Sequence, residues 1–104
     1  MFLFSTKKNN VVNVNEIKKD LGKISLIDIR EPYEYSSGHI PTAKNIPMNV
    51  LLNNPEKYLE KNNEYYIVCQ SGARSALTCK SLSKQGFNVV NVIAGTGSYI
   101  GKLD

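Results

Sequence analysis

Apolar and polar positions alternate in blocks along the chain, and the blocks predict strands and helices in turn. Short runs of apolar and β-branched residues are typical of strands. Such runs lie at residues 11–12, 24–29, 43–46, 65–68 and 87–93. The run from Tyr65 to Val68 is apolar throughout, which is typical of a strand that is covered on both faces.

Helical stretches separate these runs. They lie at residues 15–21, 31–37, 48–52, 55–60 and 73–85. We expect Asn15 to cap the first helix and Gly22 to end it, and Pro32 suits the first turn of the second. One side of the last helix carries Ala76, Cys79, Leu82 and Ser83. The alternation predicts an α/β domain with a mainly parallel sheet and helices on both faces.

Length and composition narrow the class of protein. A chain of 104 residues suits one domain, which we expect to span residues 1–104, with residues 1–10 as a terminal segment without an assigned role. With 41% hydrophobic and 21% charged residues, the composition is that of a globular domain and excludes disorder. The chain has no apolar run of membrane-spanning length. Its first apolar residues precede Lys7 and Lys8, whereas a secretory signal begins with its charges, so we expect a cytoplasmic protein.

The charge balance favours an anionic substrate over a nucleic acid. Thirteen basic residues against nine acidic ones leave a net charge of +4, which helps an anion to approach. The lysines are scattered, which is typical of a solvated surface, so we expect no nucleic-acid partner. Only two basic residues are arginines, Arg30 and Arg74, and arginine suits sites that need a rigid fork of donors.

The stretch from Cys69 to Arg74 is the strongest candidate site. It follows a predicted buried strand and precedes the longest helix, and ligands of parallel sheets bind at such loops. Small residues around Gly72 allow successive backbone amides to point at one spot, which makes an anion nest at a helix N-terminus. The nest would stabilise a Cys69 thiolate, and Arg74 would brace the loop or face an anionic substrate. Cys69 could instead be a small buried hydrophobe, but the pattern of Cys, Gly, Arg and Ser favours a function.

Four further residues have chemistry of interest. Cys79 lies about 9 Å along the helix from the loop, beyond disulfide reach of Cys69, and we expect it in the core. Two cysteines are also too few for a disulfide framework or a structural zinc site. Asp28 and Arg30 end a strand, and we expect an ion pair that organises nearby loops rather than a weak surface pair. We expect the single histidine, His39, to hold loop backbone groups rather than act as a base for Cys69.

Taken in order and at these spacings, four segments resemble the small single-domain form of the rhodanese family. They are Leu26–Glu31, Gly38–Pro47, Tyr66–Ala76 and Gly86–Phe87, and the resemblance covers about residues 11–101. It implies a three-layer α/β sandwich whose central, mostly parallel sheet has about five strands and carries helices on both faces.

The resemblance also implies a reaction. Cys69 would be the nucleophile that takes a sulfane sulfur from a small anionic donor such as thiosulfate. It would hold the sulfur as a persulfide and pass it to cyanide or a cellular thiol, without a metal or organic cofactor. The binding loop would consist of the amides of Gln70, Ser71, Gly72, Ala73 and Arg74. The supporting residues would be Asp28, Arg30 and Ser75.

The C-terminal part departs from the family pattern. Family members usually carry a Gly-Gly pair and then a Trp, whereas this chain has Thr96 after Gly95 and contains no Trp. Tyr99 or Ile100 would replace the Trp in the packing. Gly95, Gly97 and Gly101 predict that the C-terminal end is rich in loops, with one helical turn. We expect the departure to affect this packing and one wall of the site, and to leave the loop from Cys69 untouched.

Three other functions stay open. Phosphatases and arsenate reductases of this fold have one more residue between the cysteine and the arginine than the four that separate Cys69 from Arg74, so this chemistry is disfavoured. The chain could also be a non-catalytic regulatory module, or a persulfide carrier that works with a partner in a sulfur relay.

Overall fold

The apolar runs of the sequence form the strands of one parallel sheet. The computed structural model describes residues 10–104, so the interpretation of the apolar residues and lysines before residue 10 lies outside the described part. The strands of this part are β1 (Val11–Asn13), β2 (Leu26–Asp28), β3 (Lys44–Asn45), β4 (Glu64–Val68) and β5 (Asn88–Ile93). Their order is β1-β5-β4-β2-β3, and each neighbouring pair is parallel. The predicted α/β class with a mainly parallel sheet is confirmed.

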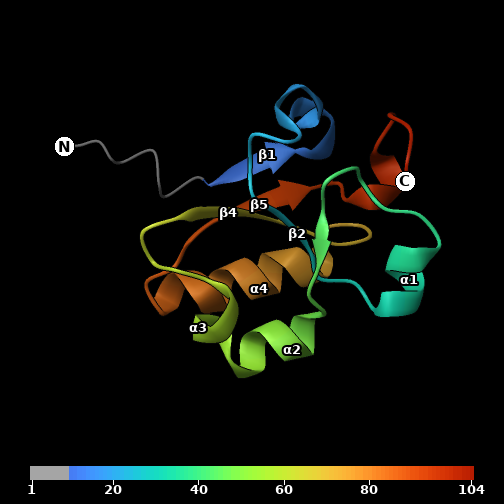
Figure 1. Ribbon diagram of the computed structural model, residues 1–104. Helices are drawn as coiled ribbons and strands as arrows, with labels where there is room; N and C mark the ends of the chain where they lie inside the picture. The colour runs from blue at the N-terminus through green and yellow to red at the C-terminus, as the bar shows by residue number, and fades with distance from the viewer. Residues whose placement is uncertain (1–9) are drawn as a thin grey trace.

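Helices cover one face of the sheet, and short helical turns cover the other. The covering helices are α2 (Met48–Asn53), α3 (Pro55–Tyr58) and α4 (Ala73–Lys84), which Figure 1 shows together on one side. The remaining helical elements are α1 (Pro32–Ser36) and the 3₁₀ turns η2 (Val14–Glu16), η3 (Lys18–Asp20) and η4 (Thr96–Ser98). The carboxyl ends of the strands point towards α1 and the C-terminus (Figure 1). Among residues 10–104, no helix is long and apolar enough to cross a membrane.

Two apolar clusters hold the layers together. The cluster under α4 includes Ile29, Ile67 and Leu82, all of them fully buried. The cluster on the opposite face includes Val14 and Val92, also fully buried. Burial of a side chain of this size contributes about 1.5–3 kcal/mol to folding, so these two clusters keep the strand ends in place.

The helix that we predicted over residues 15–21 is wrong, because the chain forms two 3₁₀ turns there. The cap is Asn13 rather than Asn15: the side chain of Asn13 accepts a hydrogen bond from the backbone of Asn15 at 2.9 Å. Val14 and Ile17 are the buried residues of this segment, and a spacing of three is the period of a 3₁₀ helix.

The buried side of α4 matches the predicted one in part, because Cys79 and Leu82 are buried as expected. The side that packs on the sheet carries Ser75, Thr78, Cys79 and Leu82. Ala76 and Ser83, which we placed on that side, are exposed. Ser75, at the start of the helix, lies on this buried side and donates a hydrogen bond to Cys69.

Candidate active site

The loop from Cys69 to Arg74 joins β4 to α4 and curls around the Cys69 sulfur. Gly72 caps α4 with φ +112°, a left-handed conformation that side chains rarely adopt. Because of this turn, the Gly72 amide donates a hydrogen bond to Cys69 Sγ at 3.1 Å. The Ser75 amide, in the first turn of α4, donates another at 3.3 Å. The sulfur therefore lies at a helix N-terminus, where negative charge is stabilised.

The environment of Cys69 favours its thiolate although the residue is only 1% exposed. Burial alone raises the pKa of the thiol. Hydrogen bonds from the Ser75 hydroxyl and from the amides of Ser75, Gly72 and Ser71 outweigh burial, and the pKa lies below its usual value. In the thiol form the S–H donates to Ser75 Oγ at 3.4 Å, and this hydroxyl donates to the Gly72 carbonyl. The hydroxyl can turn its hydrogen towards sulfur once the thiol has lost its proton.

The amides that bond Cys69 Sγ come from the middle and the end of the loop, and the cradle for the outer sulfur of a persulfide stays a prediction. Among residues 10–104, hydrogen bonds from amides to Sγ come from Gly72 and Ser75, with a contribution from Ser71 to the lowered pKa. Gln70 serves the loop differently, since its side chain accepts a hydrogen bond from Arg30 at 3.0 Å. Ala73 begins α4 and continues the turn that directs these amides inwards.

The C-terminal segment from Gly95 to Gly97 packs against the backbone of the loop. The Thr96 amide donates to the Cys69 carbonyl at 2.8 Å, and the Gly97 amide donates to the Gln70 carbonyl at 3.0 Å. Gly95 has φ +72°, and a Cβ there would lie 2.7 Å from the Cys69 carbonyl oxygen, closer than real Cβ contacts. The backbone of this segment therefore supplies two of the bonds that fix the loop. Both donors are backbone amides, which Thr96 provides as a glycine would, so our expectation that the departure leaves the loop untouched stays a prediction. Sequence patterns could not reveal these bonds, since backbone amides carry no residue-specific signal.

The same segment continues into the packing on the other face of the sheet. Tyr99 packs against the buried cluster there, whereas Ile100 is 80% exposed. Of the two residues that we considered as a replacement for the missing Trp, Tyr99 is therefore the one that packs.

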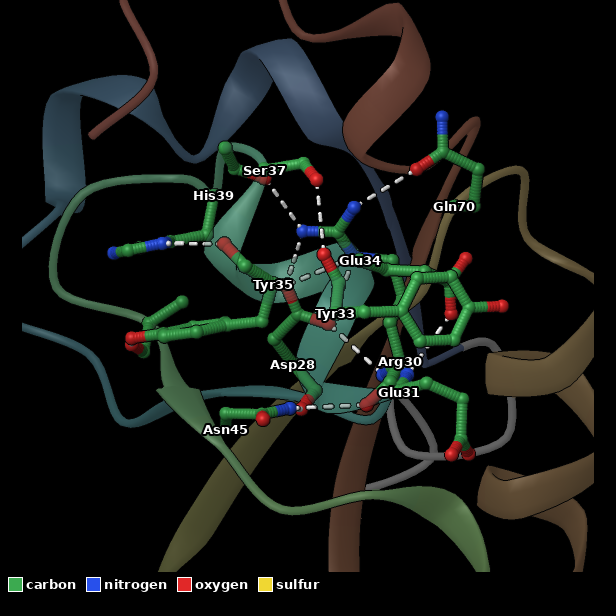
Figure 2. Close-up of polar contacts among 12 residues, drawn as sticks. Asp28, Arg30, Glu31, Tyr33, Glu34, Tyr35, Ser37, His39, Asn45 and Gln70 are labelled. Atoms are coloured by element: carbon green, nitrogen blue, oxygen red, sulfur yellow. Dashed lines mark hydrogen bonds and ion pairs between the residues drawn. The ribbon is translucent and has the colours of Figure 1, made fainter.

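Asp28 and Arg30 form a buried ion pair at the end of β2. Arg30 Nη2 lies 2.9 Å from Asp28 Oδ2, and the two side chains are 4% and 0% exposed. Arg30 also donates to the Gly38 carbonyl at 2.8 Å. A further bond goes from Arg30 to the Gln70 side chain (Figure 2). Asn45, on the neighbouring strand, donates from its side chain to the backbone carbonyls of Asp28 and Arg30. The pair is thus buried and bonded to two loops, as we expected from the sequence.

Arg74 is paired with Glu34, a residue that sequence reasoning missed. Its two terminal nitrogens donate to the two Glu34 carboxylate oxygens at 2.8 and 2.9 Å. The hydrogen bond from Arg74 lowers the pKa of Glu34 to about 2, and the pair raises the pKa of Arg74. Glu34 also accepts a bond from the Glu31 amide, which caps α1. Of the two roles considered for Arg74, the structure shows the brace, here between α4 and α1. The spacing of Glu31 and Glu34 is typical of a helix capping box and could have drawn attention to Glu34. It does not indicate that Glu34 pairs with Arg74.

His39 and Cys79 take the places expected for them. The His39 ring stacks on Tyr35 with centroids 3.7 Å apart, and its Nδ1 lies 3.0 Å from the Tyr35 carbonyl oxygen. The backbone of His39 exchanges two hydrogen bonds with Asp104. Cys79 is a free thiol in the core cluster, and burial raises its pKa to about 12. These two residues therefore hold the backbone and fill the core.

A groove lies beside the loop. It has a volume of about 350 Å³ and is lined by Ile29, Glu31, Met48, Asn49, Leu52 and Arg74. Its walls come from the end of β2, from α2 and from the start of α4. Most of its lining is apolar carbon, so it suits an uncharged group beside the loop.

Comparisons with a family model, with relatives and with solved structures agree with the resemblance seen in the sequence. The model of the Rhodanese-like domain matches residues 13–101. Over 82 residues the chain is 43% identical to the "Putative sulfurtransferase YtwF" of Bacillus subtilis, covering 77% of either chain. It is 37% identical to the "Putative sulfur carrier protein YrkF" of the same organism over 78% of this chain, but it spans only 44% of that protein. A crystal structure of a rhodanese-like domain protein from Staphylococcus aureus is 34% identical, with a TM-score of 0.78 over 91% of this chain and 96% of the other.

Proposed function

Because this chain belongs to the Rhodanese-like domain family, we propose that it is a sulfurtransferase that carries sulfane sulfur as a persulfide on Cys69. The observation that carries the proposal is the position of Cys69 Sγ, which accepts two amide hydrogen bonds at the N-terminus of α4. The names of YtwF and YrkF, which refer to a sulfurtransferase and a sulfur carrier, support the reaction class. The two free thiols suit a reducing compartment, so we place the protein in the cytoplasm.

The reaction proceeds in two displacements at sulfur. In the first, the Cys69 thiolate attacks the sulfane sulfur of the donor, and the S–S bond of the donor breaks. With thiosulfate as donor, sulfite leaves with the electron pair, and Cys69 carries the persulfide anion. The amides of Gly72 and Ser75 stabilise this charge without a general base. In the second, an acceptor such as cyanide or a thiol takes the outer sulfur, and the Cys69 thiolate leaves.

Features of the loop disfavour two alternative functions. Oxyanion chemistry of the phosphatase or arsenate reductase kind needs a free cation at the loop, but both terminal nitrogens of Arg74 are bonded to Glu34. A non-catalytic regulatory module does not need the lowered pKa of Cys69. A persulfide carrier that delivers sulfur to a relay protein uses the same residues, and the name of YrkF supports this form of the proposal.

Intact-protein mass spectrometry tests the proposal. The wild type and Cys69→Ser are incubated without reductant with thiosulfate, and separately with inorganic polysulfide. We expect the wild type alone to gain the mass of one sulfur atom and to lose it again on addition of cyanide. Cys79→Ala serves as the matched thiol control and should load as the wild type does. Sulfur that is gained equally by Cys69→Ser would move the nucleophile elsewhere.

A further inference from the structure

We propose that the sulfur donor of Cys69 is the persulfide of a thiol, R–S–SH, in preference to a dianion such as thiosulfate. This inference rests on the proposed function and names the class of donor for the same site. Two observations support it. Both arginines near the loop are paired with carboxylates, Arg74 with Glu34 and Arg30 with Asp28. The groove beside the loop is lined mainly by apolar side chains.

The charge of Arg74 is cancelled by a fixed counter-ion. Both terminal nitrogens of its guanidinium are bonded to the Glu34 carboxylate at 2.8 and 2.9 Å. Glu34 is held in this position by the Glu31 amide, which donates to it at 2.9 Å. Because the Glu34 carboxyl has a pKa of about 2, it stays ionised at every physiological pH. An incoming anion therefore meets a neutral pair at this side of the loop.

The charge of Arg30 is cancelled in the same manner. Asp28 accepts hydrogen bonds from Nε and Nη2 of Arg30, and the pair is buried. Other bonds of this guanidinium go to the Gly38 carbonyl and to Gln70. Because the guanidinium is buried and already bonded to these partners, it can contribute little positive charge to the binding of a second anion. The stabilisation of negative charge at Cys69 thus comes from amides and the helix N-terminus, which suit a single charge.

The groove beside the loop has the chemistry of a site for the R group. Ile29, Met48 and Leu52 supply apolar carbon, and the groove has a volume of about 350 Å³. Two charged side chains line it, Glu31 and Arg74, and Arg74 is already neutralised by Glu34. The exposed carboxylate of Glu31 leaves the groove with a negative charge, which repels a dianion more strongly than a neutral molecule.

The two donors place different charges at the loop. The Cys69 thiolate attacks the outer sulfur of neutral R–S–SH, the donor S–S bond breaks, and R–S⁻ leaves with the electron pair. The product is Cys69–S–SH, whose proton passes to solvent to leave the persulfide anion in the nest. The complex carries one negative charge in this reaction and three in the attack on thiosulfate. Without an unpaired cation from either arginine, the second complex is less stable.

The test compares rate constants for persulfide formation on Cys69. Intact mass spectrometry of quenched samples gives the second-order rate constant with thiosulfate, with free cysteine persulfide and with persulfidated serum albumin. We expect the wild type to load faster from a persulfide than from thiosulfate. A faster reaction of the free compound supports a small-molecule source, and a faster reaction of the albumin supports a protein source.

Glu34→Gln is the decisive variant. Glutamine keeps the shape and the acceptor for the Glu31 amide, but it leaves the charge of Arg74 uncompensated. We expect the rate with thiosulfate, divided by the rate with persulfide, to rise about tenfold. Glu56→Gln removes the same charge from an exposed position on α3, away from the groove, and should leave the ratio unchanged.

The outcomes separate this inference from the proposed function. A wild type that loads faster from thiosulfate than from both persulfides overturns the inference, as does a ratio that Glu34→Gln leaves unchanged. The proposed function survives either result, provided that loading still needs Cys69. Loading of Cys69→Ser at the wild-type rate overturns the proposed function, and the inference with it.

Discussion

Cys69 and Cys79 are two buried thiols in one core cluster, with opposite properties. Cys69 ends a strand and accepts hydrogen bonds from the first turn of α4, whereas Cys79 lies further along the helix among apolar side chains. Burial opposes the charge of both thiolates, and only at Cys69 do hydrogen bonds outweigh it. The difference lies in the partners of the sulfur and not in its burial.

The pH dependence of alkylation reports this difference. We expect Cys69 to react with iodoacetamide with a midpoint below the pKa of about 8.5 of a free thiol. Ser75→Ala removes the hydroxyl that bonds the sulfur and helps to lower the Cys69 pKa, so the midpoint should rise. The profile is measured by mass spectrometry in a Cys79→Ala background. An unchanged midpoint in Ser75→Ala would show that the amides alone stabilise the thiolate.

Cys79 should matter for stability and not for sulfur transfer. Cys79→Ala removes a sulfur atom from the core under α4, and we expect a loss of about 1 kcal/mol in the free energy of unfolding. Urea denaturation measures this loss, and the sulfur-loading assay should give the wild-type rate. A lost second transfer step in this variant would instead indicate a resolving thiol.

At the scale of the elements, the loop after β4 is held between two segments distant in sequence. On one side, the backbone amides of Thr96 and Gly97 donate hydrogen bonds to carbonyls of the loop. On the other, Glu34 of α1 forms an ion pair with Arg74. The strand, the loop and the helix supply the sulfur and its donors. The other two segments keep those donors pointing inwards.

Gly95→Ala tests the contact behind the loop. A Cβ at this position would press into the backbone of Cys69 and Gln70, and the left-handed φ adds strain. We expect a loss of about 3 kcal/mol in the free energy of unfolding, together with slower sulfur loading. Gly22→Ala is the matched control, since Gly22 has φ +92° but nothing within 4 Å, and it should cost only about 1–2 kcal/mol. Equal losses would mean that the conformation matters and the contact does not.

The bridge between α1 and α4 should show in the pH dependence of stability. The pKa of Glu34 is lowered from 4.5 to about 2, so its pairing stabilises the fold above pH 4.5 and is lost as the pH falls towards 2. Glu34→Gln should therefore lower the free energy of unfolding by about 1 kcal/mol at pH 7, and the difference from the wild type should shrink below pH 4.5. Urea unfolding at pH 7 and pH 3 measures it. A difference that is constant with pH would assign the effect to packing.

At the scale of the whole molecule, the ion pair of Asp28 and Arg30 joins parts of the chain that are far apart in sequence. It links the end of β2 to the segment at Gly38 and to the loop at Gln70, the latter through the bond drawn in Figure 2. A buried pair of this kind contributes little net stability compared with apolar packing, but the loss of one partner leaves an uncompensated charge. The pair therefore serves to position the loops at the active edge of the sheet.

Asp28→Asn should destabilise the protein strongly. The variant leaves the Arg30 guanidinium buried without its counter-ion, and we expect a loss of about 3–5 kcal/mol in the free energy of unfolding. Asp20→Asn, at a half-exposed position on η3, is the control and should cost less than about 1 kcal/mol. Chemical denaturation compares the two variants. A loss below about 1 kcal/mol in Asp28→Asn would mean that water reaches the pair.

The correct predictions from sequence were those that depend on local pattern. Apolar runs marked the strands and the alternation marked the α/β class, because burial of one face imposes a period on the residues. The helix at residues 15–21 was wrong, and the buried side of α4 was right for Cys79 and Leu82 but wrong for Ala76 and Ser83. Asn13 caps the first segment earlier than expected, and Ser75, which bonds Cys69, lies on the buried side of the second.

The sequence by itself determined the α/β class, the family resemblance and the candidate thiol at the end of a buried strand, because these follow from the order and spacing of residue types. Only the tertiary structure decided that Glu34 neutralises Arg74 and that the segment from Gly95 to Gly97 holds the loop. Glu34 and Arg74 are 40 residues apart in the chain, and the contact behind the loop is made by backbone atoms. Such contacts depend on how the elements meet in space, and no period or motif in the sequence encodes them.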